Sequence, residues 1–356
     1  MWSLFRAIAI DYDGTLTTAE RPEPQVLEAI AAVRREDVRV VLVTGRRVDS
    51  LLRAMPDARD HFDAIVAENA GVLVRGEHVE SLAAAIPESL ASALAARGVR
   101  FHRGHVLLAT WAPHAVTVLD EISRLGLDVQ IIRNRGALML LPPGVTKGAG
   151  LVRALGELGV SYHNAIAVGD AENDHAMFEV SELAVAVANA VPSLQEHADV
   201  VLGRPAGEGI VELLAGPILR GDVRAVSRRL GIELGEADDG TPVMWPATPS
   251  NLLVTGPSGA GKSYVAGAIA ERLVRLDYSV CVLDPEGDYE YLAGLRGTSY
   301  LGGPSPSPQL LGQLLSHRFG SVVFDTSQVS EARRGDVIRE ALCVIGCERE
   351  KSPWWM

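Results

Sequence analysis

Short apolar runs that end in polar residues recur through the first 200 residues of the chain. The clearest runs are Ala7–Ile10, Val38–Val43, Ala64–Ala67 and Ala165–Val168. Runs of this length without alternation are typical of buried strands in a parallel sheet. Amphipathic stretches between them, such as 22–35 and 149–158, predict helices. The order of strands and helices therefore predicts an α/β fold built around a parallel sheet.

Between residues 87 and 142 the pattern changes to helix, strand, strand, and then repeats. Helices are expected at 88–97 and 114–125, and strands near 99–101, 106–110, 128–132 and 137–141. Two such units form a four-stranded antiparallel sheet covered on one face by two helices. We assign residues 81–142 as a cap inserted into a core of 1–80 and 143–215, where inserted modules commonly act as lids. Cap side chains that could contact a substrate, although each is more often plain surface or core, are His102, Arg103, His105, Trp111, Arg133 and Arg135.

After residue 215 a linker precedes a second α/β region. Residues 216–248 contain Asp239-Gly240, a strong hairpin signal. A helix is expected at 222–230, with a basic face formed by Arg220, Arg224 and Arg228. Residues 249–356 begin with a predicted strand at 251–255 and form a second domain.

Composition narrows the class of protein. The chain has 356 residues, is 47% hydrophobic and carries a formal charge of -12, as expected for two globular domains. The acidic balance argues against nucleic acid and against an anionic membrane surface as partners. Only three cysteines, no leader and no bilayer-length apolar run predict a cytoplasmic protein without a membrane contact. The oligomeric state stays open.

Polar clusters follow the strands at what should be one edge of the sheet. Asp11 and Asp13 follow the first strand, Thr44 follows the second, and Asp170 follows a later one. Lys147 starts a helix, where a cation is unfavourable beside the positive dipole end unless an anion is near. Each cluster alone has a structural explanation, an Asp-Gly turn or a helix cap. Together, at the edge where open α/β sheets bind ligands, they predict a functional site.

In combination and order these clusters resemble the motifs of the haloacid dehalogenase superfamily, in its subfamily IIB with a cap between the second and third motifs. The matching residues are Asp11-Tyr12-Asp13-Gly14-Thr15, Thr44-Gly45-Arg46, Lys147 and Gly169-Asp170-Ala171-Glu172-Asn173-Asp174. The resemblance covers about residues 5–215. It implies a Mg²⁺-dependent phosphoryl-transfer enzyme on a Rossmann-like core.

The resemblance also implies a role for each residue. Asp11 is the expected nucleophile that forms an aspartyl-phosphate, and Asp13 the acid and base. Thr44 and Lys147 are expected to bind and neutralise the phosphoryl oxygens. Asp11, the Asp13 carbonyl and Asp170 are the expected Mg²⁺ ligands. Residues expected to orient this site are Gly45, Arg46, Asn173 and Asp174.

The compact cap resembles that of phosphoglycolate and sucrose-phosphate phosphatases, so we expect a small phosphomonoester as substrate. A phosphomutase of the same subgroup is an alternative. One departure from the family is Glu68-Asn69-Ala70-Gly71, where relatives often have glycine before alanine. It affects the local loop geometry rather than the chemistry.

The second domain carries a complete phosphate-binding loop between a predicted strand and a helix. The residues expected to bind ATP there are Gly256, Gly259, Ala260, Gly261, Lys262 and Ser263. Lys262 is expected to reach the terminal phosphates and Ser263 to bind Mg²⁺. With Asp284-Pro285-Glu286-Gly287, the loop resembles the HerA and FtsK-like motor ATPases.

Ser321–Asp325 resembles a Walker B strand only superficially, because Thr326 follows where an acid is expected. The chain stops about where the catalytic strand of such motors would begin. We therefore expect a truncated P-loop domain that binds ATP and hydrolyses it poorly. Two alternatives stay open: an ATPase or translocase-like module that the first domain regulates, and a binding protein in which both sites are degenerate.

Overall fold

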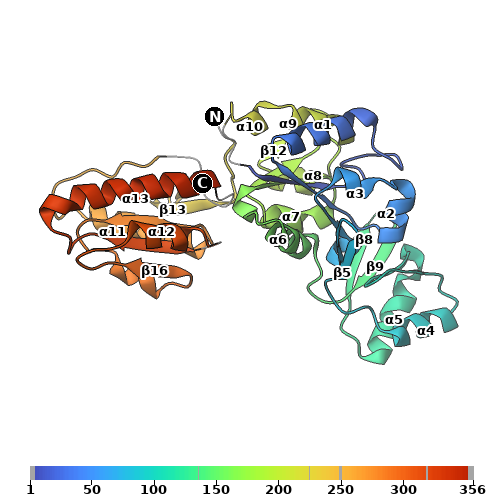
Figure 1. Ribbon diagram of the computed structural model, residues 1–356. Coiled ribbons are helices and arrows are strands. Elements are labelled where there is room, and N and C mark those ends of the chain that lie inside the picture. The colour runs from blue at the N-terminus through green and yellow to red at the C-terminus, as the bar shows by residue number, and fades with distance from the viewer. Residues whose placement is uncertain (1–4, 135, 224, 248–250, 318–319, 352–356) are drawn as a thin grey trace. The chain divides into compact units, whose positions relative to one another are not determined.

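The computed structural model describes residues 5–134, 136–223, 225–247, 251–317 and 320–351 (Figure 1). Internal contacts divide the chain into two compact units, with the boundary between Ala225 and Val226. Each unit has its own hydrophobic core.

The first unit is built on an eight-stranded sheet with the order β12-β11-β10-β1-β2-β3-β4-β5. Its strands are β1 (Ala7–Asp11), β2 (Arg39–Val43), β3 (Ala64–Ala67), β4 (Val72–Arg75), β5 (His78–Ser81), β10 (Ala165–Gly169), β11 (Leu183–Ala186) and β12 (Val200–Val201). Strands from β12 to β3 pair in parallel, and β4 and β5 add an antiparallel edge. Because β1 lies between β10 and β2, the carboxyl ends of these three strands meet at one edge.

Helices cover both faces of this sheet. They are α1 (Pro24–Arg35), α2 (Val48–Ala54), α3 (Ala58–His61), α6 (Lys147–Glu157), α7 (His175–Glu179), α8 (Pro192–His197), α9 (Ala206–Leu214) and α10 (Pro217–Arg220). Helices α1 and α9 pack together on one face, and α6 and α7 pack together on the other (Figure 1). The unbroken apolar runs of β1 and β10 are fully buried, as expected for strands covered on both faces.

The cap forms a separate four-stranded antiparallel sheet with the order β6-β7-β9-β8. Its elements are α4 (Glu88–Ala96), β6 (His102–Arg103), β7 (Leu108–Trp111), α5 (Ala115–Leu125), β8 (Gln130–Asn134) and β9 (Ala137–Leu141). Leu90, Leu94 and Val118 from the two helices pack on Leu108 and Leu140 of the sheet.

The predicted cap strand at 99–101 is wrong, because the chain there still completes the end of α4. The N–H of Val99 donates to the carbonyl of Leu94 over 3.0 Å, and the Val99 side chain is buried in the cap core. The strand therefore starts later, at His102.

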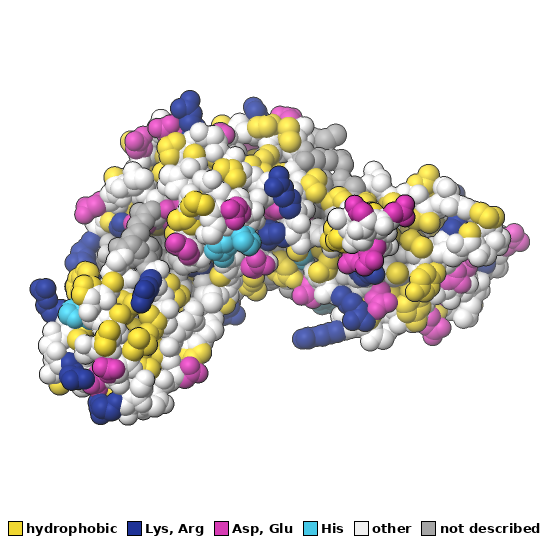
Figure 2. All heavy atoms as spheres, turned by 180° about the vertical axis from the view of Figure 1, so that it is seen from behind, with side chains coloured by type: hydrophobic (Ala, Val, Ile, Leu, Met, Phe, Trp, Pro, Cys, Tyr) yellow, Lys and Arg dark blue, Asp and Glu magenta, His cyan; other side chains and the backbone are white. Residues whose placement is uncertain are grey.

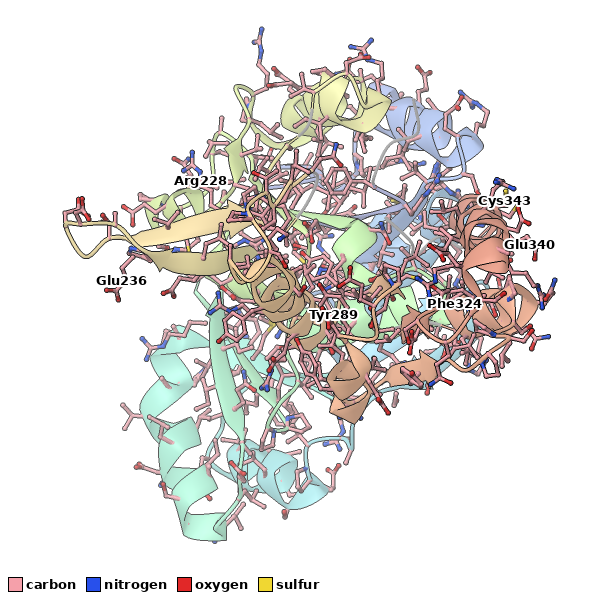
Figure 3. The ribbon with its side chains drawn as sticks, turned by 90° about the vertical axis from the view of Figure 1, so that its left-hand side faces the viewer. Arg228, Glu236, Tyr289, Phe324, Glu340 and Cys343 are labelled. Atoms are coloured by element: carbon pink, nitrogen blue, oxygen red, sulfur yellow. The ribbon has the colours of Figure 1, made fainter. Side chains whose placement is uncertain are left out.

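The second unit combines a hairpin with a small parallel sheet. The predicted hairpin is present as β13 (Gly231–Glu236) and β14 (Pro242–Pro246), and Glu236 lies near its tip (Figure 3). The sheet has the order β15-β17-β16, and its elements are α11 (Lys262–Arg275), β15 (Cys281–Asp284), β16 (Thr298–Leu301), α12 (Pro308–Leu315), β17 (Ser321–Asp325) and α13 (Glu331–Lys351). Phe324 of β17 is fully buried, whereas Cys343 on α13 is exposed (Figure 3).

Two elements expected in this part of the chain are absent from the described residues. The described residues of 222–230 form no helix: α10 ends at Arg220, Gly221 caps it with a φ of 76°, and Ser227 accepts the N–H of Arg229 in a turn. Arg224, in its expected basic face, lies outside the described residues. Residues 251–255 form no strand, and Leu253 is 84% exposed. None of the described strands pairs with this run.

On the face drawn in Figure 2, basic and acidic side chains are interspersed along both units. Within the described residues, no helix is both long enough and apolar enough to span a bilayer.

Candidate active site

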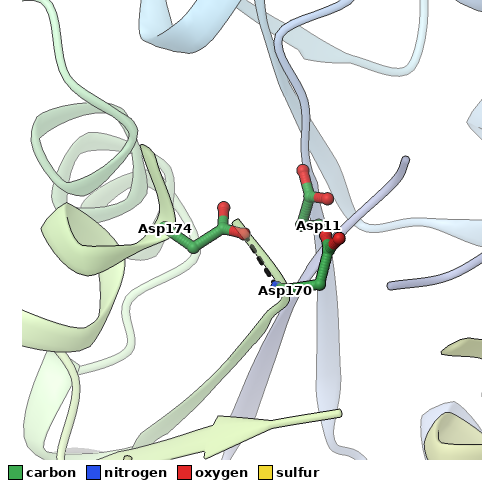
Figure 4. A group of neighbouring side chains, drawn as sticks. All are labelled: Asp11, Asp170 and Asp174. Carbon is green, nitrogen blue, oxygen red and sulfur yellow. Dashed lines mark hydrogen bonds between the residues drawn. The ribbon is translucent and has the colours of Figure 1, made fainter. Parts of the chain in front are cut away.

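Three buried carboxylates meet at the edge where β1 and β10 end (Figure 4). Asp11 is the last residue of β1, Asp170 follows β10, and Asp174 ends the short helix η4 (Glu172–Asp174). One oxygen from each carboxylate lies within 4.8 Å of the others, and the residues are only 4%, 2% and 0% exposed. The parallel pairing of β1 with β10 brings Asp11 and Asp170 together across more than 150 residues of sequence.

Lys147 joins two of these carboxylates. Its Nζ donates to Oδ1 of Asp11 and to Oδ1 of Asp174, each over 2.6 Å, and the lysine is 2% exposed. Burial lowers the pKa of Lys147, but the charges of Asp11 and Asp174 outweigh it and raise that pKa overall. Burial also raises the pKa of Asp11 well above its ordinary value, while Lys147 opposes this change. The unfavourable cation at a helix start is thus explained by the two anions it contacts.

Asp174 is held by both of its oxygens. While Oδ1 accepts from Lys147, Oδ2 accepts the N–H groups of Asp170 and Ala171 over 2.9 and 3.0 Å (Figure 4). Asp170 in turn accepts the Thr15 hydroxyl over 3.0 Å. Asp174 therefore orients the loop that carries Asp170 and is the least available of the three carboxylates as a ligand.

The charge of this cluster fits a divalent cation. Three carboxylates and one ammonium leave a formal charge of -2 (-3 plus 1) in a buried place. Buried charge without compensation is costly. The oxygens of Asp11 and Asp170 are the kind of ligand that Mg²⁺ prefers.

The side chain of Asp13 lies outside this cluster and is bound by Arg46. The guanidinium Nε donates to Oδ2 of Asp13 over 2.9 Å, and Nη2 donates to Oδ1 over 2.6 Å. The guanidinium also lies 4.5 Å from the centre of the Tyr12 ring. Paired hydrogen bonds of this kind hold a carboxylate in one orientation. Arg46, expected only as an orienting residue, is a direct partner of the expected acid and base.

The structure places the other predicted residues close by. Thr44 is fully buried and accepts the N–H of Arg46 over 3.0 Å. Gly45 lies under the cap, where an added Cβ would be 3.4 Å from Sδ of Met139. Asn173 donates to the side-chain oxygen of Asn69 over 3.4 Å. The chemical roles of all these residues stay predictions.

The cap covers this edge, since β8 lies against η4. His102 and Trp111 contact each other edge to face, with ring centroids 5.5 Å apart. Arg103 forms an ion pair with Glu88 over 3.0 Å. The structure therefore gives these three cap side chains partners within the cap. Arg133 lies on β8, and Arg135 is outside the described residues.

Glu68, for which the sequence predicted no role, lies in the loop that follows β3. Its carboxylate is fully buried and accepts backbone N–H groups from the cap. The departure from the family pattern at this loop was the signal that could have found it.

In the second unit, the predicted phosphate-binding loop leads directly into α11, which begins at Lys262. Gly259 and Gly261 have φ values of 81° and 85°, a region that favours glycine. Lys262 Nζ donates to the carbonyl of Pro257 over 2.8 Å, within its own loop. Ser263 is hydrogen-bonded to the side chain of Tyr289, labelled in Figure 3.

Both parts of the chain resemble known proteins. Residues 8–97 and 118–214 match the family model of haloacid dehalogenase-like hydrolases. A phosphoglycolate phosphatase of Methanothermobacter thermautotrophicus is 34% identical over 217 residues, which is 58% of this chain and 96% of that protein. One from Archaeoglobus fulgidus is 32% identical over 217 residues, covering 59% and 95%.

A solved haloacid dehalogenase-like hydrolase from Bacteroides thetaiotaomicron shares the fold. It has a TM-score of 0.52 at 19% identity and covers 59% of this chain and 98% of its own. Residues 250–326 match the model of the central domain of the helicase HerA. The predicted resemblances of both domains and the predicted phosphatase class are thus confirmed. The chain belongs to the haloacid dehalogenase-like hydrolases, with a HerA-like P-loop domain after the hydrolase.

Proposed function

We propose that the first unit is a Mg²⁺-dependent phosphatase that hydrolyses a small phosphomonoester of the phosphoglycolate or sugar-phosphate type. The observation that carries the proposal is the buried cluster in which Lys147 joins Asp11 to Asp174 beside Asp170. The relatives named phosphoglycolate phosphatases make phosphoglycolate the first substrate to test.

In the proposed reaction Asp11 attacks phosphorus. Its oxygen forms a bond to the phosphoryl group while the bond to the leaving oxygen breaks, and the Lys147 ammonium stabilises the negative charge. Asp13 gives a proton to the leaving oxygen. It then takes a proton from water, which attacks phosphorus and releases phosphate and the free Asp11 carboxylate. Thr44 would donate its hydroxyl to a phosphoryl oxygen.

Arg46 binds both carboxylate oxygens of Asp13, so this pairing must open before Asp13 can reach the leaving oxygen. We infer that the pairing loosens when substrate arrives and offers its own anionic oxygens to Arg46. Asp13 then becomes available to the leaving oxygen.

Asp11, the Asp13 carbonyl and Asp170 would hold Mg²⁺, with Asp174 and Asn173 orienting them. The ion supplies additional positive charge to the phosphoryl oxygens. The net charge of the cluster and its oxygen-only donors support this assignment.

Removal of divalent metal is expected to abolish phosphate release. Full-length enzyme treated with EDTA should fall to background, and added Mg²⁺ should restore turnover. The measurement is inorganic phosphate released from a panel of phosphorylated metabolites. We expect kcat/KM for phosphoglycolate to exceed that for hexose phosphates by about tenfold, an increment of about 1.4 kcal/mol.

Full activity in EDTA would refute the Mg²⁺ assignment alone. A hexose phosphate as the best substrate would refute only the choice of phosphoglycolate. A product that is an isomeric phosphoester, without phosphate release, would favour the phosphomutase alternative.

We also propose that the second unit binds ATP through residues 256–263, supported by the match to the HerA central domain and by the loop before α11. Lys262→Ala should weaken binding of a fluorescent ATP analogue by about tenfold or more, because the lysine supplies charge to the terminal phosphates. The phosphatase activity of Lys262→Ala should not change. The control variant Arg275→Ala, at the other end of α11, should bind the ATP analogue with wild-type affinity. Equal affinity in Lys262→Ala and wild type would reject the site.

ATP turnover is expected to be slow, because Thr326 follows the strand Ser321–Asp325 at the position where an acid is expected. Rapid, Lys262-dependent ATP hydrolysis would instead favour the alternative in which the second unit is the motor and the hydrolase regulates it.

A further inference from the structure

The loop that follows β3 has an unusual backbone. Glu68, Asn69 and Ala70 all have positive φ values, of 55°, 55° and 86°. For residues with a Cβ such conformations are unfavourable, although asparagine adopts them more readily than glutamate or alanine. Strain of this kind persists only where surrounding contacts determine it, and it gathers at functional sites.

On one side, the loop at residues 68–70 contacts the segment after β2 that carries Thr44 and Arg46. The N–H of Glu68 donates to the carbonyl of Arg46 over 2.9 Å, and the N–H of Asn69 donates to the carbonyl of Thr44 over 3.0 Å. The side chain of Asn69 accepts from Asn173. The strained loop is therefore tied to two of the segments that carry the expected catalytic residues.

On the other side, the Glu68 side chain of the loop binds the cap. Oε1 of Glu68 accepts the N–H of His105 over 2.9 Å, and Oε2 accepts those of Val106 and Leu107 over 2.8 and 3.2 Å. These donors lie in the turn between β6 and β7 of the cap. An ionised carboxylate only accepts hydrogen bonds and can accept several at once, so the Glu68 side chain can bind all three N–H groups.

The fit between the turn and the loop is tight. A Cβ on Gly104 would lie 2.5 Å from Cδ of Glu68, and one on Gly71 would lie 2.8 Å from Cβ of Val106. Val106 and Leu107 belong to the hydrophobic cluster of the core sheet rather than to that of the cap. The turn is thus one of the parts of the cap that pack into the core, together with Met139 and Leu141 of β9.

We propose that Glu68 is a positioning residue that fixes the cap over the Asp11 site by gathering the three N–H groups of residues 105–107. The carboxylate and the strained backbone form one connection from Thr44 and Arg46 to the cap. Its consequence for turnover rests on the proposed phosphatase function, whereas its consequence for the cap does not.

The first test is amide hydrogen exchange of the full chain without substrate. Glu68→Gln keeps the shape but offers one acceptor oxygen, so at least one of the three amides loses its partner beside an NH₂ group. Exchange at residues 105–107 should rise about 5- to 100-fold, the range expected for an unsatisfied buried group. Glu121→Gln is the matched control and should leave exchange at residues 105–107 unchanged. Glu121 is also a buried cap carboxylate, but it is bonded to Arg97 and Arg124.

The proposal is overturned if exchange at residues 105–107 stays at the wild-type rate in Glu68→Gln. It is also overturned if exchange rises equally in β1 and β10, since that would show a general loss of stability. Neither result depends on whether the enzyme hydrolyses phosphoglycolate.

A double-variant cycle guards against a misfolded single variant. Gly104→Ala should disturb the turn because its Cβ meets the Glu68 carboxylate, and Glu68→Ala removes that obstacle. We expect the double variant to exchange more slowly at residues 105–107 than the two single effects predict together. Strict additivity would refute the contact.

Kinetics separate positioning from folding. A misplaced cap should raise the KM for phosphoglycolate about tenfold in Glu68→Gln, whereas loss of folded enzyme lowers only the apparent kcat. An unchanged KM would overturn the positioning role in turnover.

Discussion

Asp11→Asn is expected to reduce phosphate release by about 10⁴-fold or more, because loss of a nucleophile removes the covalent step. Asparagine keeps the shape of the side chain at the end of β1 but loses its negative charge. It also removes one of the two carboxylates that bind Lys147. The measurement is phosphate release with Mg²⁺ at saturating substrate, using p-nitrophenyl phosphate as a second substrate. Asp57→Asn, in a surface ion pair with Arg21, is the control and should retain activity.

Asp13→Asn should fail differently. A good leaving group such as p-nitrophenolate needs no protonation, so the first step survives while activation of water is lost. The aspartyl-phosphate should then accumulate, detectable by acid quench and mapping of the phosphoryl group to Asp11. A fully active Asp11→Asn, or a phosphoryl group on another residue, would contradict the proposed mechanism.

Lys147→Met is expected to cost about 3–5 kcal/mol in the free energy of unfolding without metal, because it leaves Asp11 and Asp174 buried without their cation. The measurement is urea unfolding of the first-unit transition in EDTA and in Mg²⁺. Mg²⁺ should restore part of the lost stability, since it supplies positive charge to the same carboxylates. Phosphatase turnover should fall in both conditions. Arg153→Met, on the exposed face of the same helix, is the matched control and should change stability by less than about 1 kcal/mol.

The pH dependence of this variant has a definite sign. Lys147 opposes the burial that raises the pKa of Asp11, so removing Lys147 raises that pKa further. An acid whose folded-state pKa is raised loses stability as pH rises from the unfolded toward the folded pKa. In EDTA the destabilisation of Lys147→Met should therefore grow as pH rises above the ordinary carboxyl range. A constant difference between variant and wild type across that range would contradict the charge-based explanation.

The gathering of polar side chains at one edge of the sheet could be anticipated because its signal is local. Asp11, Thr44 and Asp170 each follow an apolar run, and parallel strands place such ends together. Lys147 was found through a local conflict with the helix dipole. The partners could not be anticipated: that Lys147 also contacts Asp174, and that Arg46 binds Asp13, depends on side-chain geometry across the sheet.

The two features that the sequence did not predict correctly depend on tertiary contacts. The apolar run at 251–255 resembles a strand, but a strand needs neighbours whose identity is not written in the run itself. Glu68 resembles an ordinary loop residue until the cap turn, over 35 residues later, is placed against it. Both cases depend on contacts between segments distant in the sequence.

The central position of β1 has a consequence for synthesis of the chain. One neighbour, β2, follows within 30 residues, but the other, β10, is translated only after the whole cap. At about 5–20 residues per second, the ribosome needs roughly 10–30 s to cover that interval. During this time one edge of β1, whose first four residues are all apolar, has no partner, and unpaired strand edges of this kind promote aggregation. The inserted cap thus also delays completion of the core sheet. Substitutions that slow folding of the cap should therefore lower the yield of soluble protein, even where the kcat and KM of the folded enzyme do not change.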